Sequence, residues 1–359
     1  MQVNLYTDAE VFDRLREEWD GLLARSFGDT LFYRPAWLQA WWQVFGREGA
    51  LRVIAVRDER RRLVGVAPLF LGQVLADGSE PVPSLSYERP NPPPTATAHQ
   101  ALLLVGGTEV SDYLDLIVDR SEGPRVYEAV FRTLEREVDG WEWLDLHCLP
   151  DGSPTPAALT ELATAAGWRA QLTPEDVCPY IELPGSWEAY LAMLGRKERH
   201  ELRRKMRRAE RSAQVEIVET ADPATLDDHL ATFVALHEAS TADKADFMRD
   251  PRMQDFFGRV ARTTLENGWL DLSFLILNGE WAASMFCFRY RGAVMVYNSG
   301  FDPQAYATLS PGLVLLGHRI KQAIETGWRE FDFMQGDERY KYDLGGQDRP
   351  VRRLFVRRG

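Results

Sequence analysis

The sequence has little cysteine and no long apolar run. Its three cysteines, Cys148, Cys178 and Cys287, are far apart and odd in number. This excludes a disulfide framework and a CxxC metal site, so a reducing cytoplasm fits best. No stretch approaches the roughly 18 apolar residues that span a bilayer, and the N-terminus lacks a basic start followed by an apolar segment. We therefore expect a cytoplasmic protein with no membrane association.

Basic side chains are also in the minority, with 42 Lys and Arg against 54 Asp and Glu and a net charge of -12. This balance argues against a protein that coats nucleic acid with its whole surface, and we expect no DNA partner. The six histidines show no HExxH pattern, so no metal is expected. GxSxG, GxxxxGK[ST] and GxGxxG are absent, so serine hydrolase, P-loop and dinucleotide-binding functions lack their usual motifs.

The length of 359 residues favours two domains. Helical and strand-like segments alternate along the chain, which predicts an α/β fold with mixed sheets. In the first half we expect helices at 8–25, 35–45, 125–138 and 155–166, strands between them, and a long proline-rich loop at 77–100. In the second half we expect helices at 186–213, 222–240, 252–266 and 311–326, and strands at 270–278, 280–290, 293–301, 329–334 and 351–357.

A short motif occurs once in each half. Residues 140–146 and 327–333 share the pattern G-W-x-x-apolar-D-apolar, and each follows a predicted helix. The pattern describes a C-terminal helix glycine leading into a buried strand with one acidic residue. It favours two copies of one α/β unit, a first domain at 1–184 and a second at 185–359.

Residues 196–211 form the most unusual segment. They contain nine Lys and Arg against three Glu, so the segment carries +6 and the rest of the chain carries -18. On a helix, Leu202, Met206 and Ala209 form an apolar stripe that can pack on a core. The basic residues form either a solvated charged face or an anion site for phosphates of a cofactor, a nucleotide-linked substrate or RNA.

A second candidate site begins at Ser310-Pro311-Gly312, after the predicted strand 293–301. Ser310 suits an N-cap and Pro311 the first helical position. The free N–H groups of Gly312 and of the next residue, Leu313, would then form a positive helix end with room for a phosphate. The alternative is an ordinary helix start.

A third candidate site follows strand 329–334. Asp332 needs a partner if it is buried, and Lys341 or a backbone N–H would serve. In the structural interpretation this is only an ion pair. In the catalytic one, Asp337 or Glu338 accepts a proton, while Tyr340 and Lys341 donate to an oxygen that gains charge.

Taken in order, the basic segment, L-H-x(6)-K-x-x-F, D-P-x(6)-S-P-G, F-D-F and Y-K resemble the BioF2-like or CelD-like acetyltransferase domain of the GNAT superfamily over residues 186–345. That domain is similar to the Fem aminoacyltransferases, which implies a tandem pair of GNAT-like acyl-CoA N-acyltransferase folds. The resemblance implies acyl transfer to an amine from acetyl-CoA or another acyl-CoA. In the Fem branch the donor is an aminoacyl-tRNA.

Residue by residue, the resemblance places the CoA pyrophosphate at Ser310, Pro311, Gly312 and Leu313. A single glycine there departs from the common Q/R-x-x-G-x-G/A pattern. Tyr340 and Lys341 match the terminal Y-K, with Glu338 or Asp337 as the base. The candidates for substrate binding are Arg199, Arg203, Arg204, Arg207, His237, Lys244, Phe247, Asp302 and Asp332.

The first half has neither S-P-G nor Y-K, so we expect it to be non-catalytic. The leading hypothesis is an N-acyltransferase that acts in a ternary complex on a small-molecule or peptide amine. The hypothesis depends on a gap between neighbouring strands of the second half, with bare amides directed into it. The alternatives are an aminoacyl-tRNA-dependent transferase, whose partner would be tRNA, and a non-catalytic ligand-binding protein with the same fold.

Overall fold

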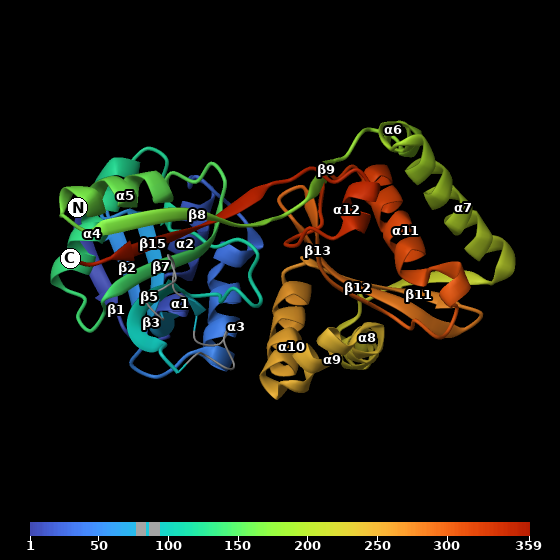
Figure 1. The fold of residues 1–359 in the computed structure, drawn as a ribbon, viewed down its shortest axis with the longest axis horizontal. Coiled ribbons are helices and arrows are strands. Elements are labelled where there is room, and N and C mark those ends of the chain that lie inside the picture. Colours follow the sequence, from blue (N-terminus) through green and yellow to red (C-terminus); the bar gives the residue numbers. More distant parts are fainter. Residues whose placement is uncertain (77–83, 86–93) are drawn as a thin grey trace. The chain divides into compact units, whose positions relative to one another are not determined.

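The computed structural model describes residues 1–76, 84–85 and 94–359, and the chain divides into two compact units (Figure 1). The first unit comprises Met1–Asp176 and Pro350–Gly359, and the second comprises Val177–Arg349. Within these described ranges, no helix is both long and apolar enough to cross a bilayer.

The first unit is a mixed sheet in the order β1-β2-β3-β5-β7-β15-β8. Strands β5 and β7 pair in parallel, and the ladders from β1 to β5 and between β7 and β15 are antiparallel. Its strands are β1 Gln2–Tyr6, β2 Leu51–Arg57, β3 Leu63–Ala76, β4 Ser84–Leu85, β5 Thr97–Leu104, β6 Ile117–Val118, β7 Trp143–Pro150, β8 Arg169–Val177 and β15 Pro350–Arg357. Its helices are α1 Val11–Arg14, α2 Arg16–Leu23, η1 Leu31–Tyr33, α3 Pro35–Phe45, α4 Gly123–Arg136 and α5 Thr155–Ala165.

The second unit is a mixed sheet in the order β10-β11-β12-β13-β14-β9. Helices α11 and α7 cover one face, and α8, α9 and α10 cover the other (Figure 1). The strands are β9 Tyr180–Glu182, β10 Val215–Glu219, β11 Leu270–Leu277, β12 Glu280–Tyr290, β13 Ala293–Phe301 and β14 Glu330–Asp332. The helices are α6 Trp187–Met193, α7 Arg196–Ser212, η2 Pro223–Thr225, α8 Leu226–Ser240, α9 Ala242–Arg249, α10 Pro251–Glu266, η3 Ala307–Leu309, α11 Pro311–Glu325 and α12 Arg339–Asp343.

Six strands have the same order and sense in both sheets, and the first sheet also contains β8 beyond β15 and the short strands β4 and β6. Four strands pair antiparallel in sequence, β1-β2-β3-β5 in the first unit and β10-β11-β12-β13 in the second, and the fourth then pairs in parallel with β7 or β14. The last strand beside each parallel pair, β15 or β9, runs antiparallel to it. The two copies of one α/β unit predicted from the sequence are therefore present.

The structural division differs from the predicted boundary at 184/185. Strand β9 precedes that boundary but belongs to the second sheet, and β15 follows it but belongs to the first. Each sheet thus receives the strand beside its parallel pair, β15 or β9, from the other side of the predicted joint. The side chain of Arg353 in β15 holds Asp145 of β7 at 2.5 Å, and this ion pair favours the observed position of β15.

Two predicted elements of the first half differ from the structure. The helix expected at 8–25 is divided at Leu15 into α1 and α2, and it begins after Glu10 rather than at residue 8. The loop expected at 77–100 contains β4 and the start of β5, because residues 97–104 pair with β3. The rest of that loop, at 77–83 and 86–93, lies outside the described residues.

The predicted apolar stripe of α7 packs as expected. Leu202, Met206 and Ala209 are buried in the core of the second unit, and the first two contact α11 at Gly317. A Cβ on Gly317 would lie 3.0 Å from both side chains, so the absence of a side chain lets the two helices approach closely.

Candidate functional site

The candidate site lies where β13 and β14 separate. Their parallel ladder covers only Ala293–Met295 and Glu330–Asp332, whereas β13 continues to Phe301. A bulge at Tyr297 interrupts the pairing of β13 with β12, and bulges bend a strand locally. The edge of β13 after Met295 therefore faces an opening in the sheet.

A cavity of about 500 Å³ occupies this opening. Its walls come from α7, α9, β12, β13, the start of α11 and the segment around α12. The lining residues are Lys197, Glu198, Glu201, Leu202, Lys205, Lys244, Ser284, Met285, Val296, Ser299, Gly300, Phe301, Gly312, Leu313, Leu316, Glu338, Tyr340, Asp343 and Leu344.

Gly312 and Leu313 bring the N-terminus of α11 to the cavity. The first helical hydrogen bond runs from Val314 N–H to Ser310 C=O at 3.1 Å, so the two preceding N–H groups lie outside the helical ladder. Ser310 occupies the predicted N-cap, but its backbone is left-handed (φ 54°) and its hydroxyl caps no N–H. Among the described residues, those that line the cavity do not include Ser310 or Pro311.

Three more predicted residues, Lys244, Glu338 and Tyr340, meet at the cavity from α9 and the α12 segment. The Lys244 ammonium donates to Ser299 C=O, and burial lowers its pKa while the nearby Glu338 carboxylate opposes that shift. Burial, with the Glu338 charge, raises the pKa of Tyr340, so its phenol keeps its proton at neutral pH. The site thus holds a cation, a carboxylate and a hydroxyl donor.

His237 and Phe247 lie behind the cavity wall. His237 Nε2 is 2.9 Å from Asn298 Oδ1, and its ring contacts those of Phe233 and Phe247. Burial and the Lys244 charge lower the pKa of His237 to about 4, so the imidazole is neutral at pH 7. We therefore place His237 and Phe247 in the supporting core.

Asp332 and Asp302 serve local structure. Asp332 is buried and accepts from Met334 N–H at 2.8 Å and from Arg349 at 3.1 Å. A backbone N–H was one of its two expected partners, whereas the arginine was not foreseen. Asp302 accepts the N–H groups of residues 304 and 305 in a turn. Neither aspartate lines the cavity among the described residues.

Lys341 is buried beneath the segment that carries Glu338. Its ammonium donates to the carbonyl groups of Met334, Gln335 and Gly336 at 3.0, 2.7 and 3.0 Å, and lies 2.9 Å from Glu338 Oε2. Four oxygens therefore surround this one ammonium group. Lys341 is not among the described residues that line the cavity. Asp337 is exposed and also lies outside that lining.

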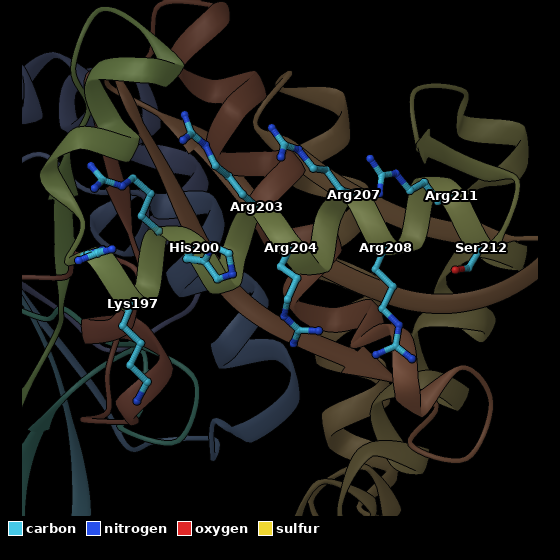
Figure 2. Close-up of a pocket in the computed structure, with 10 residues that line it drawn as sticks. Lys197, His200, Arg203, Arg204, Arg207, Arg208, Arg211 and Ser212 are labelled. Carbon is cyan, nitrogen blue, oxygen red and sulfur yellow. The ribbon is translucent and has the colours of Figure 1, made fainter.

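The four predicted arginines lie on the outer face of α7. Arg199, Arg203, Arg204 and Arg207 line an open groove of about 990 Å³ together with other basic residues of the helix (Figure 2). Arg203 pairs with Glu188 and Arg204 with Glu201. Arg199 and Arg207 make no ion pair within the described part of the chain. The cavity and this groove share Lys197.

Sequence reasoning missed most of the cavity wall. Glu198, Glu201, Leu202 and Lys205 have the spacing of one helical stripe, so the inner flank of α7 could have been identified from periodicity. Gly300 and the other β13 residues could not, because strand alternation does not show where a partner strand diverges. At Gly300 a Cβ would lie 2.4 Å from the backbone nitrogen of His237, so α8 approaches β13 at a position that requires glycine.

The residues that the structure describes nearly fill the corresponding place in the first unit. At the end of the β5–β7 parallel ladder the free space is about 10 Å³, and His147 is part of its lining. His147 lies 3.2 Å from Asp145 and 2.5 Å from Glu175. Burial opposes protonation there, but the two carboxylates outweigh it and raise the pKa of His147 to about 9. A charged, paired side chain thus lies where the second unit has its opening.

The comparisons with known proteins agree with this geometry. Residues 196–342 match the family model described as acetyltransferase (GNAT) domain. The match lies within the second unit, where the sequence motifs indicated a GNAT domain. A search of curated protein sequences finds no significant match.

Solved structures resemble the whole chain. The crystal structure of FemX has a TM-score of 0.63 at 12% identity and covers 99% of this chain and 97% of its own. A conserved protein of unknown function from Bacteroides thetaiotaomicron has a TM-score of 0.56 at 11% identity, covering 99% of this chain and 100% of its own. L-PGS from Bacillus licheniformis has a TM-score of 0.53 at 10% identity, covering 95% and 91%. At these identities the likeness concerns the fold alone. The predicted fold class, a tandem pair of GNAT-like α/β units, is confirmed.

Proposed function

We propose that this protein is an N-acyltransferase that moves an acyl group from an acyl-CoA, with acetyl-CoA as the first candidate, to an amine. The observation that carries the proposal is the cavity at the β13–β14 opening, which combines the start of α11 with Lys244, Glu338 and Tyr340 in a GNAT domain. Acyl-CoA is a substrate in this proposal and no metal takes part.

The donor would lie with its diphosphate at the α11 N-terminus. The N–H groups of Gly312 and Leu313 and the positive end of the helix favour a phosphate there. A Cβ on Gly312 would contact the Phe301 ring at 3.3 Å, so glycine keeps this end of the cavity open. The acyl thioester would then reach the apolar surface around Met285, Val296 and Leu316.

The transfer would be a direct attack in a ternary complex. The amine nitrogen bonds to the thioester carbonyl carbon, the carbon–sulfur bond breaks, and the CoA thiolate leaves with the electron pair. Glu338 is the favoured base because it lines the cavity and Asp337 does not. Tyr340 would donate to the oxygen or sulfur that gains charge, since its phenol remains protonated.

The contacts of Lys341 favour a role different from that of a donor. With three carbonyls and one carboxylate around it, this ammonium would brace the segment that presents Glu338 and Tyr340. The first unit would be non-catalytic, in keeping with its nearly filled opening.

A thermal-shift panel with acetyl-CoA, longer acyl-CoAs and CoA tests the proposal, because a ligand that binds the native state raises its melting temperature. We expect a shift with the intact chain and little shift with Gly312→Glu, which places a negative charge beside the helix N–H groups. Gly185→Glu adds the same charge at an exposed position whose Cβ would meet no atom within 4 Å, so this control should keep the shift. No shift with any CoA compound would refute the proposal.

A further inference from the structure

The outer face of α7 carries a strongly basic groove of about 990 Å³. Figure 2 shows two diverging rows along the helix, with Arg203, Arg207 and Arg211 on one side and Lys197, Arg204 and Arg208 on the other. The complete lining is Arg196, Lys197, Arg199, His200, Arg203, Arg204, Arg207, Arg208, Arg211 and Ser212. From the first to the last arginine the helix rises about 22 Å at 1.5 Å per residue.

Most of these cations lack an acidic partner. Arg203 reaches Glu188 at 2.5 Å and Arg204 reaches Glu201 at 2.7 and 2.9 Å. Within the described ranges, six lining residues make no hydrogen bond or ion pair through their side chains. They are Arg196, Lys197, Arg199, Arg207, Arg208 and Arg211. Because like charges four residues apart repel on a helix, this arrangement gains nothing for folding and points to an external anion.

The packing of α7 limits the kind of anion. Leu202, Met206 and Ala209 are buried in the core of the unit, so the apolar stripe of the helix is not available to enter a lipid layer. Just before α7, Met193 is a large apolar residue that is exposed. One such side chain offers little apolar surface with which to anchor the helix at a membrane interface. A row of arginines over a length of about 22 Å suits an extended chain of phosphates, since each guanidinium can bind phosphate in bidentate fashion.

We propose that the α7 groove binds the phosphodiester backbone of a single-stranded nucleic acid. The two rows of cations flank one groove, which can hold a single nucleic-acid strand along its length. Helix α7 has no Phe, Tyr or Trp on which bases could stack, so binding would depend on the backbone and not on base sequence. The rest of the chain carries -18, which confines the contact to this helix.

Fluorescence anisotropy with the full chain and a labelled oligo(U) of about 12 nucleotides tests this proposal. If the six unpaired cations each neutralise one phosphate, log K should fall against log salt with a slope of about -4, at about 0.7 per contact on a single strand. Oligo(dT) has the same backbone charge and should bind with similar affinity and slope, in contrast to the expectation from net charge that no DNA binds. A slope near zero, or no binding at about 50 mM salt, would overturn the proposal.

The triple variant Arg199→Gln, Arg207→Gln, Arg211→Gln removes half of these contacts, and glutamine preserves helix propensity. We expect a slope near -2 and affinity about 100-fold lower at 0.1 M salt. The matched control, Arg132→Gln, Arg136→Gln, Arg249→Gln, removes three exposed arginines elsewhere and gives the same net charge. Equal losses in both variants, with far-ultraviolet circular dichroism unchanged, would overturn the assignment to α7.

Vesicles of an anionic phospholipid are the third ligand whose binding to the protein is measured. Binding to vesicles without binding to either oligonucleotide would identify a membrane surface instead and refute the proposal. The inference does not depend on acyl transfer. The thermal shift with CoA compounds tests a ligand site at the start of α11, whereas the oligonucleotide experiment tests the outer face of α7. Each proposal can therefore fail while the other stands.

Discussion

Asp145 of β7 and Asp332 of β14 occupy equivalent positions in the two sheets. Each is the third residue of a three-residue parallel ladder, and each is buried. Each also accepts from an arginine, Arg353 for Asp145 and Arg349 for Asp332. The acidic residue in the repeated G-W motif is therefore a structural element of both units, which explains why the motif occurs twice.

The substitution Asp145→Asn should lower the free energy of unfolding by about 3 kcal/mol, because it leaves Arg353 and His147 without their buried partner. Burial opposes ionisation of Asp145, but His147 and Arg353 outweigh it and lower its pKa. A lowered pKa gives stability above the unfolded value near 4, which is lost as pH falls through the folded value. Urea unfolding at neutral and acidic pH measures this. Exposed Asp139→Asn is the control, and equal losses in both variants would contradict the prediction.

The repeated motif made the duplication visible in the sequence, but it could not give the sheet membership of β9 and β15. Strand β9 has only three residues just before the predicted boundary, and β15 has eight residues near the end of the chain. The apolar pattern of either strand fits either sheet. Their position depends on contacts distant in sequence, such as the pair between Arg353 and Asp145, which are 208 residues apart. The apolar periodicity within a strand cannot identify a partner residue that is distant in the sequence.

Replacing Gly300 by alanine should destabilise the second unit by about 1 to 3 kcal/mol, as overpacking of a core does. The new Cβ would lie 2.4 Å from His237 N and 2.6 Å from Leu236 C, and helix backbone cannot move aside as a side chain can. Urea unfolding gives the difference. Gly185→Ala is the control, because no atom lies within 4 Å of its Cβ position. An unchanged unfolding midpoint for the Gly300 variant would show that α8 is not held against β13.

His237 should make the second unit sensitive to mild acid. Its pKa is lowered to about 4 by burial and by Lys244, against about 6.5 in the unfolded chain. The unfolded state therefore binds a proton first, and about 3 kcal/mol of stability should be lost as pH falls from 6.5 toward 4. Unfolding of wild type and His237→Gln over this range tests the claim. The free energy of unfolding of the variant should fall less on acidification than that of the wild type. Parallel curves of unfolding free energy against pH would contradict the prediction.

The sequence predicted the cavity residues that belong to ordered motifs. Gly312, Leu313, Lys244, Glu338 and Tyr340 all line it. Other motif residues support the site from behind, and the sequence could not separate the two groups. Which face of a helix or turn borders an opening depends on how neighbouring strands diverge, which is a tertiary property.

Lys341→Met should destabilise the second unit by several kcal/mol, because three carbonyl groups and Glu338 lose a buried donor. Lys341→Arg tests whether a cation alone suffices, and we expect it to recover part of the loss. Urea unfolding measures stability, and CoA binding by thermal shift reports on the site. Full stability of the methionine variant together with loss of transfer would restore the role of Lys341 as a catalytic donor.

Tyr340→Phe should lower acyl transfer about 100-fold with little change in stability, as expected when one donor to a developing negative charge is removed. The residue is 39% exposed, so loss of one hydroxyl should change its packing little, and the raised pKa of Tyr340 keeps it a proton donor at neutral pH. Release of free CoA thiol from acetyl-CoA with a panel of primary amines measures turnover. Tyr342→Phe is the matched control, since Tyr342 is 38% exposed and its hydroxyl donates to Asp348 at 2.7 Å. CoA affinity should be unchanged in both variants. If both lose turnover equally, the effect comes from the α12 segment as a whole and the donor role of Tyr340 is wrong.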